Sequence, residues 1–78
     1  IPASAAPYIN MGNFYLLERD TVKAVSNWET AARLDPSNQK VLLNITNYYG
    51  KKGEQAKYQH YLSLYNQAVE KTRKKQRR

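Results

Sequence analysis

Residues 7–36 read PYINMGNFYLLERDTVKAVSNWETAARLDP, and this stretch decides the fold. Its large apolar members are Tyr8, Met11, Tyr15 and Trp28, and its small members are Gly12, Ala24 and Ala31. Spacings of three and four residues are typical of one face of an α-helix, and a short polar break separates two such faces. Small residues let two helices cross closely. The stretch therefore predicts a pair of helices packed against each other.

With the closing Pro36, the pattern resembles the tetratricopeptide repeat, a helix–turn–helix unit of 34 residues. Residue types permitted by that family fill eight of its positions, at Tyr8, Met11, Gly12, Tyr15, Ala24, Trp28, Ala31 and Pro36. The resemblance covers about residues 5–70 and is weakest in the last helix. It implies an all-α fold in which four antiparallel helices form two repeats, a segment of a right-handed superhelix.

An internal repeat supports two units independently of the family. Shifting the sequence by 34 residues aligns Tyr8–Leu16 with Leu42–Gly50. Three identities result: Asn10 with Asn44, Asn13 with Asn47, and Tyr15 with Tyr49.

The second unit departs from the pattern in its second helix. An ungapped alignment places Tyr58 and Tyr65 where small residues are expected, which would overfill a close helix crossing. A turn shorter by two residues would instead use Ala56 and Ser63, with His60 at the aromatic position. Both registers stay open, so the fourth helix either caps the array or packs in a shifted register.

Capping residues and apolar faces predict the limits of the helices. The first helix is expected from about Pro7 to Glu18 with Arg19 at its end, and the second after an Asp20 cap until Pro36. Ser37 is expected to cap a third helix, about Asn38 to Lys52, which Gly53 ends, and the fourth is expected from near Glu54 towards Lys74. The predicted core faces are, in chain order, Tyr8, Met11, Gly12 and Tyr15; Ala24, Val25, Trp28, Ala31, Ala32 and Leu34; Leu42, Ile45, Thr46 and Tyr49; and Tyr58, Tyr61, Leu62, Tyr65 and Val69.

The length of 78 residues fits one small domain. We expect a flexible lead-in at 1–7, a tetratricopeptide-like domain at 8–70 (repeats 5–38 and 39–72) and a basic tail at 71–78. The absence of Cys excludes disulfides, and the apolar runs are too short for a membrane span. We interpret the chain as an excised piece of a longer protein, soluble and with an intracellular location favoured. Self-association through an exposed repeat face is a further expectation.

No catalytic constellation is visible, because His60 is the single histidine and there is no cysteine nucleophile. We predict no enzyme activity and no cofactor or metal. The asparagines in helix interiors are more informative, because asparagine is unfavourable at such positions. The resemblance implies that the first helix of each repeat lines a concave groove that binds a partner protein or peptide. The candidate groove residues are Asn10, Asn13, Asn44, Asn47, Ile9, Leu43 and Lys51, with Leu16 and Leu17 completing the wall.

Two alternatives accompany this groove. In the first, the asparagines are merely solvated groove residues whose register is fixed by packing. In the second, the chain is a structural spacer that binds nothing and only stacks against neighbouring repeats of a larger scaffold. The family's carboxylate-clamp variant fits poorly, because Ile9 stands where a lysine is needed. Among the tyrosines, most are expected in helix contacts, and Tyr48 is the one placed most readily at a binding surface.

The net charge of +7 comes almost entirely from the tail. Residues 1–70 carry seven basic and six acidic residues, a balance of +1, whereas residues 71–78 hold six basic residues and no acid. The tail residues are Lys71, Arg73, Lys74, Lys75, Arg77 and Arg78. A solvated helix end, a nuclear-localisation or nucleic-acid contact, and a patch for acidic lipid or protein are the three interpretations. Nucleic acid is expected only through this tail and without sequence specificity.

Overall fold

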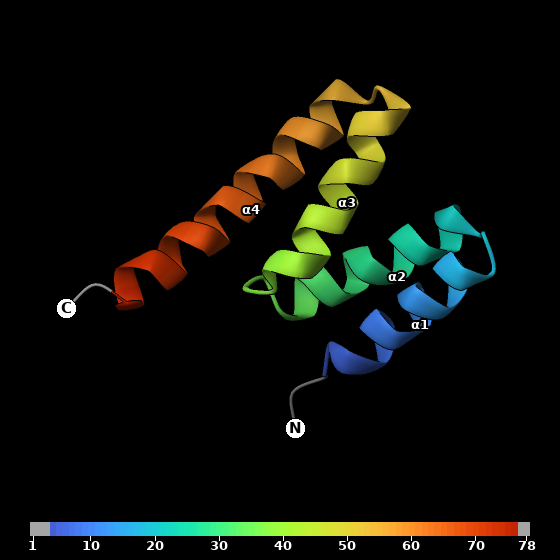
Figure 1. The fold of residues 1–78 in the computed structure, drawn as a ribbon, viewed down its shortest axis with the longest axis horizontal. Coiled ribbons are helices and arrows are strands. Elements are labelled where there is room, and N and C mark those ends of the chain that lie inside the picture. The colour runs from blue at the N-terminus through green and yellow to red at the C-terminus, as the bar shows by residue number, and fades with distance from the viewer. Residues whose placement is uncertain (1–3, 77–78) are drawn as a thin grey trace.

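Four helices and the turns between them make up the described part of the chain. The computed structural model describes residues 4–76, and the side chains of residues 4–74. The helices are α1 (Ala6–Leu17), α2 (Thr21–Leu34), α3 (Gln39–Lys52) and α4 (Gln55–Gln76), and residues 4–76 contain no strand. α1 pairs with α2 and α3 with α4, while α3 also packs against α2 (Figure 1). The predicted all-α architecture of two helical hairpins is confirmed.

The expected terminal segments fall partly outside the described residues. Residues 1–3 of the lead-in lie outside them, as do Arg77, Arg78 and the side chain of Lys75 in the tail. α1 begins at Ala6, so residues 6 and 7 belong to the helix rather than to a lead-in. α4 continues to Gln76, so the first part of the basic tail is helical. No helix within residues 4–76 has the length and apolar character to cross a membrane.

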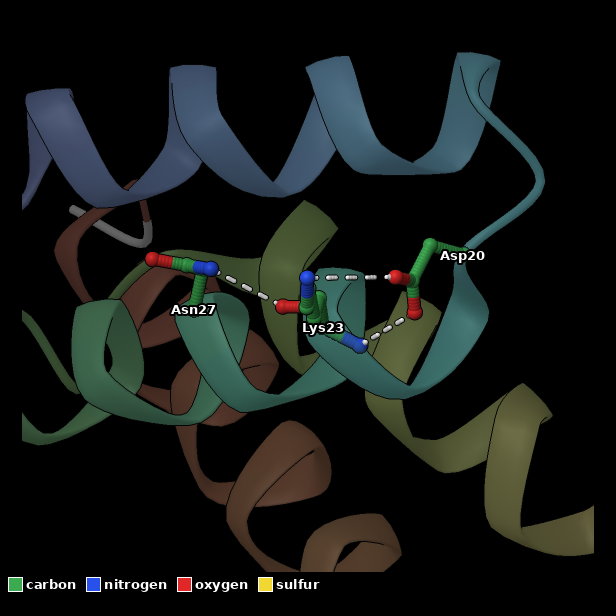
Figure 2. A network of polar contacts seen from close by, with 3 residues as sticks. All are labelled: Asp20, Lys23 and Asn27. Atoms are coloured by element: carbon green, nitrogen blue, oxygen red, sulfur yellow. Dashed lines mark hydrogen bonds and ion pairs between the residues drawn. The ribbon is translucent and has the colours of Figure 1, made fainter.

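The turn from α1 to α2 depends on Arg19 and Asp20. Arg19 has a φ of 63°, in the left-handed region that favours glycine, and this conformation lets the chain reverse direction. Asp20 caps α2, because one carboxylate oxygen accepts a hydrogen bond from the Lys23 amide at 3.1 Å (Figure 2). Its other oxygen lies 3.8 Å from Lys23 Nζ, and the Asn27 amide donates to the Lys23 carbonyl at 2.9 Å. The predicted Asp20 cap is confirmed.

The next two turns show one wrong prediction and one confirmed. Asn38, not Ser37, caps α3, and its side-chain oxygen accepts from the Val41 amide at 3.1 Å. Ser37 is diverted because its hydroxyl donates to the Asp35 carboxylate at 2.6 Å, and α3 starts one residue later than expected. Gly53 ends α3 in the left-handed conformation, with a φ of 74°, as predicted.

The core lies between α2 and α3 and includes one residue of α4. Its buried members are Ala24, Val25, Trp28, Ala31, Ala32, Val41, Leu42, Ile45, Tyr49 and Ala68. Thr46 is also buried, and its hydroxyl donates to the Leu42 carbonyl at 2.7 Å, which satisfies the polar group. The predicted α3 face of Leu42, Ile45, Thr46 and Tyr49 is confirmed.

Two residues predicted in the core are exposed instead. Met11 is 46% exposed because the large apolar residues of α1 are not confined to one face, while only its Gly12 side is buried against α2. Leu34 is 39% exposed because it continues the helical stripe of Asn27 and Thr30, which is only half-buried.

α4 packs in the ungapped register of the internal repeat. Tyr58 and Tyr65 are half-buried, whereas Ala56, His60 and Ser63 are exposed, so the shifted register is not adopted. The predicted face of Tyr58, Tyr61, Leu62, Tyr65 and Val69 is half-buried throughout, and the buried residue of α4 is Ala68, which the sequence analysis did not place on that face. At the far end of the hairpin, the Gln39 amide donates to Thr72 Oγ1 at 2.8 Å and holds α3 to α4.

The outward faces of the first and last helices differ in polarity. We define the outer face of α1 as Met11, Phe14 and Leu17, which are 46%, 56% and 82% exposed. The outer face of α4 consists of the residues that line an open depression of about 450 Å³: Gln59, Leu62, Ser63, Asn66, Gln67 and Glu70. Gln59 and Asn66 follow the buried Val25 and Ala32 of α2 by one repeat length. The face that is apolar on α2 is therefore mainly polar on α4.

Candidate functional site

α1 and α3 border two adjoining hollows whose floor is the indole of Trp28. The larger has a volume of about 290 Å³ and the smaller about 160 Å³. The larger is lined by Leu16, Thr21, Val25, Trp28, Asn44, Asn47, Tyr48 and Lys51. The smaller is lined by Ile9, Asn13, Trp28, Asn38, Lys40, Val41 and Asn44. Because Trp28 and Asn44 border both, we treat the two hollows as one feature, the α1–α3 groove.

The helical period explains which side chains reach the groove. On α1, the spacing of Ile9, Asn13 and Leu16 places them on one face, and α1 presents that face to α3. On α3, the lining stripe runs from Lys40 to Lys51 through Asn44 and Asn47. The two helices thus supply facing walls, each of which mixes amide groups with longer side chains.

Five of the seven predicted groove residues meet in this groove: Ile9, Asn13, Asn44, Asn47 and Lys51. Asn10 and Leu43 are exposed and do not line it, because each lies one residue, and so about 100° of helix rotation, from a lining residue. Leu16 lines it as expected, whereas Leu17 is 82% exposed on the outer face of α1.

The described asparagines fall into two groups: the side chains of Asn27 and of Asn38, which also lines the groove, are hydrogen-bonded, whereas those of the groove residues Asn13, Asn44 and Asn47 and of the exposed Asn10 and Asn66 are not. Asn27 donates to a carbonyl within α2, and Asn38 accepts from the first turn of α3. Among the hydrogen bonds of residues 4–76, none involves the side chains of Asn13, Asn44 or Asn47. Their donors and acceptors are therefore open to a ligand.

Tyr48 joins the groove wall, as the sequence predicted most readily of the tyrosines. It is half-buried and meets Tyr49 edge to face, with ring centroids 5.1 Å apart. Lys52 Nζ lies 5.7 Å from the Tyr48 ring centroid, within range of a cation–π contact. The Tyr48 ring is thus held by Tyr49 and by Lys52.

A polar cluster that the sequence analysis missed links three helices behind the groove. The Tyr49 hydroxyl donates to Glu29 Oε2 at 2.7 Å, and the Tyr61 hydroxyl donates to the same oxygen at 3.1 Å. The two rings are stacked, with centroids 5.8 Å apart and planes at 15°. Glu29 therefore joins α2 to both helices of the second hairpin. No local motif reveals it, because its partners are 20 and 32 residues away.

The environment of this cluster keeps both tyrosines protonated. Burial first, then the hydrogen bond to Glu29 and its negative charge, raises the pKa of Tyr49 well above the ordinary value. Burial, the charge of Glu29 and the hydrogen bond raise the pKa of Tyr61 to about 12, against a small opposing effect of Arg33. A carboxylate that accepts hydrogen bonds from two neutral hydroxyls holds the helices together and does not form an acid–base pair that works near neutral pH.

The remaining candidates lie apart from the groove. His60 is exposed and contacts the Tyr61 ring edge to face, with centroids 5.0 Å apart. Residues 4–76 contain no group of three or more His, Cys, Asp or Glu side chains placed to hold a metal ion. In the basic tail, Lys71, Arg73 and Lys74 are exposed, and Arg73 lies 3.6 Å from the Glu70 carboxylate. These basic groups extend α4 without forming a stripe on the folded body.

The two hairpins of the chain are related to each other in structure as well as in sequence. The aligned Asn13 and Asn47 both line the groove, one from each hairpin. The aligned Tyr15 and Tyr49 both lie against the core, the first half-buried and the second buried. The equivalence of the two hairpins thus extends from sequence to position. Comparison with known proteins finds no protein-family model, no curated protein and no solved structure that matches the chain.

Proposed function

We propose that the chain is a non-catalytic interaction module, built of two tetratricopeptide-like repeats, whose α1–α3 groove binds an extended peptide segment of a partner protein. The open side-chain amides of Asn13, Asn44 and Asn47 are the observation that carries this proposal. An amide pairs with both the N–H and the C=O of a peptide backbone, so it contributes affinity whatever the peptide's side chains.

The groove floor adds the apolar part of the binding energy. Trp28, Val25 and Val41 line the hollows beneath the amides. Side chains of an extended peptide alternate in direction, so every second one would face this floor. Backbone contacts from the walls and side-chain burial on the floor together match the mode in which an extended segment is bound in a groove.

A selection experiment tests this function. The 78-residue chain is used to select binders from a phage-displayed library of random peptides, about twelve residues long to span the groove. Affinities of the enriched peptides are then measured by fluorescence polarisation. Asn44→Ala and Asn47→Ala should each weaken binding about fivefold, the effect of losing one neutral hydrogen bond.

Asn10→Ala is the matched control, because it makes the same change on an exposed position of α1 outside the groove. All three variants should keep the thermal midpoint of the parent chain. Failure to enrich any peptide, or equal affinity of all variants, would overturn the proposal.

A second candidate function, a structural repeat that stacks on another helical hairpin, is favoured by the outer face of α1. Met11 and Phe14 align with Ile45 and Tyr48 in the internal repeat. Ile45 is fully buried between the two hairpins, whereas Met11 is 46% exposed. α1 therefore exposes to solvent the side that α3, the equivalent helix of the second hairpin, buries against the first hairpin. A hairpin with an apolar face like that of α2 is the fitting occupant.

Light scattering on the 78-residue chain tests the stacking function, with a second copy as the substitute hairpin. The outer face of α1 predicts a concentration-dependent dimer that Phe14→Glu abolishes and Gln67→Glu, on the outer face of α4, leaves intact. Removal of residues 71–78 should also leave it intact. A monomer at every concentration, or a dimer that depends on the tail, would contradict stacking.

A further inference from the structure

Four residues of α3 form a single stripe along the α1–α3 groove. Lys40, Asn44, Asn47 and Lys51 are spaced by four, three and four residues, which keeps them on one face of the helix. All four line the groove, with Lys40 at the smaller hollow and Lys51 at the larger. Eleven residues separate the two lysines, which corresponds to about 16 Å along the helix axis.

The charge along this stripe is positive only at its two ends. Both lysines are exposed, and none of the residues that line the groove carries a carboxylate. The ion pairs within residues 4–76 involve Lys23 and Arg73, not Lys40 or Lys51. Two ammonium groups thus face the groove without an acidic partner among the described residues, with neutral amides between them.

We propose that the groove selects an extended peptide carrying two acidic side chains about five residues apart, one for Lys40 and one for Lys51. This inference rests on the proposed function and specifies its ligand. An extended peptide advances about 3.3 Å per residue, so about five residues span the distance between the lysines. Asn44 and Asn47 hold the backbone between the two acids. Opposite charge at two fixed points selects the peptide and sets its register.

A matched peptide series tests the spacing. Each peptide is about twelve residues long and neutral apart from two Glu residues, with the amino end acetylated and the carboxyl end amidated. The spacings are one, five and ten residues, and a parallel peptide has Gln at both positions of the five-residue spacing. The five-residue peptide should bind the 78-residue chain about tenfold tighter than the Gln peptide, and this advantage should shrink at high salt.

Variants of the chain locate the contacts. Lys40→Met and Lys51→Met should each reduce the advantage of the five-residue peptide by about threefold and leave the Gln peptide unaffected. Lys71→Met is the control, because it removes an equally exposed charge on α4, away from the groove. Non-additive losses when Lys51→Met is combined with a single Glu→Gln change would identify the direct pair.

The outcomes separate this inference from the proposed function. If the Gln peptide binds as tightly as the five-residue peptide, the groove binds peptides but the acidic selectivity is wrong. Equal binding of all three spacings, or loss of affinity in Lys71→Met, overturns the two-lysine arrangement. Tighter binding of a peptide with a free carboxyl end, irrespective of spacing, would indicate recognition of the chain terminus instead. If neither this series nor the phage library gives a binder, both proposals fail.

Discussion

Gly12 of α1 lies so close to the indole of Trp28 in α2 that no side chain fits between them. A Cβ built on residue 12 would lie 2.5 Å from Trp28 Cδ1, would also overlap Nε1, and would lie 3.1 Å from the Ala24 carbonyl oxygen. Trp28 is only 4% exposed, so it has little space to retreat. The contact fixes the crossing of the first hairpin and, through the indole, the floor of the groove.

Gly12→Ala should therefore destabilise the fold. Overpacking costs about 1–3 kcal/mol of stability. Replacing glycine by alanine in a helix gains only about 1 kcal/mol, so the cost is expected to exceed the gain. The expected result is a fall in the thermal midpoint of several degrees, measured by circular dichroism.

Gly50→Ala is the comparison for this prediction. Its added Cβ would lie 3.1 Å from the ring of Tyr58, which is half-buried and borders an open hollow into which it has room to shift. The midpoint of Gly50→Ala should therefore stay close to that of the parent chain. Equal midpoints for the two variants would show that the Gly12–Trp28 contact relaxes without cost.

Arg19→Gly should stabilise the chain. Arg19 adopts a φ of 63°, where a Cβ costs about 1 kcal/mol, and glycine removes that cost while adding some entropy to the unfolded chain. A net gain of about 0.5 kcal/mol is expected from urea unfolding. Gly53→Ala should instead lower the free energy of unfolding, because Gly53 has a φ of 74° and alanine would be strained there. A loss of stability in Arg19→Gly would mean that the arginine side chain itself supports the turn.

The Glu29 cluster predicts a specific loss of stability in alkali. An unfolded tyrosine titrates near pH 10, whereas folding raises the pKa of Tyr61 to about 12 and that of Tyr49 further. The folded state thus retains protons that the unfolded state has released. The stabilisation is complete below about pH 10 and is lost as the pH rises through the folded pKa, by about 1.4 kcal/mol per pH unit for each retained proton.

Urea unfolding between about pH 9 and about pH 12 measures this loss, and absorbance at the tyrosinate band follows the ionisation of the tyrosines. Tyr61→Phe should flatten the pH dependence, while Tyr8→Phe, which changes a tyrosine outside the cluster, should not. A steep dependence that persists in a Tyr49→Phe and Tyr61→Phe double variant would rule out the cluster as its source.

The sequence was most informative where one helix face has one role. The spacing of Leu42, Ile45 and Tyr49 predicted the buried face of α3, because large apolar residues recur there three and four positions apart. It was least informative on α1, whose large apolar residues are not confined to one face, so the exposure of Met11 depended on which sides of the helix have neighbours. Adjacent capping residues were equally hard to rank, and the Asp35 carboxylate decided between Ser37 and Asn38.

The outline of the groove was also predictable from the sequence. Its asparagines stood out because helix interiors disfavour them, and repeat alignment placed Asn13 and Asn47 in register. Lys40 was missed because it lies in the first turn of α3, and only the hollow that it lines with Ile9 and Asn13 shows that this turn borders the groove. Glu29 was missed because long-range hydrogen bonds leave no periodic signal.

The difference between the outer faces of α1 and α4 bears on the proposed stacking, because it limits the size of an assembly built that way. A helical array grows without limit only if each unit offers an adhesive surface at both of its ends. Here Met11, Phe14 and Leu17 leave one end apolar and exposed, while Gln59, Asn66 and Glu70 make the other end polar. Under the proposed stacking, a unit of this kind is expected to end a stack or to pair once rather than to polymerise.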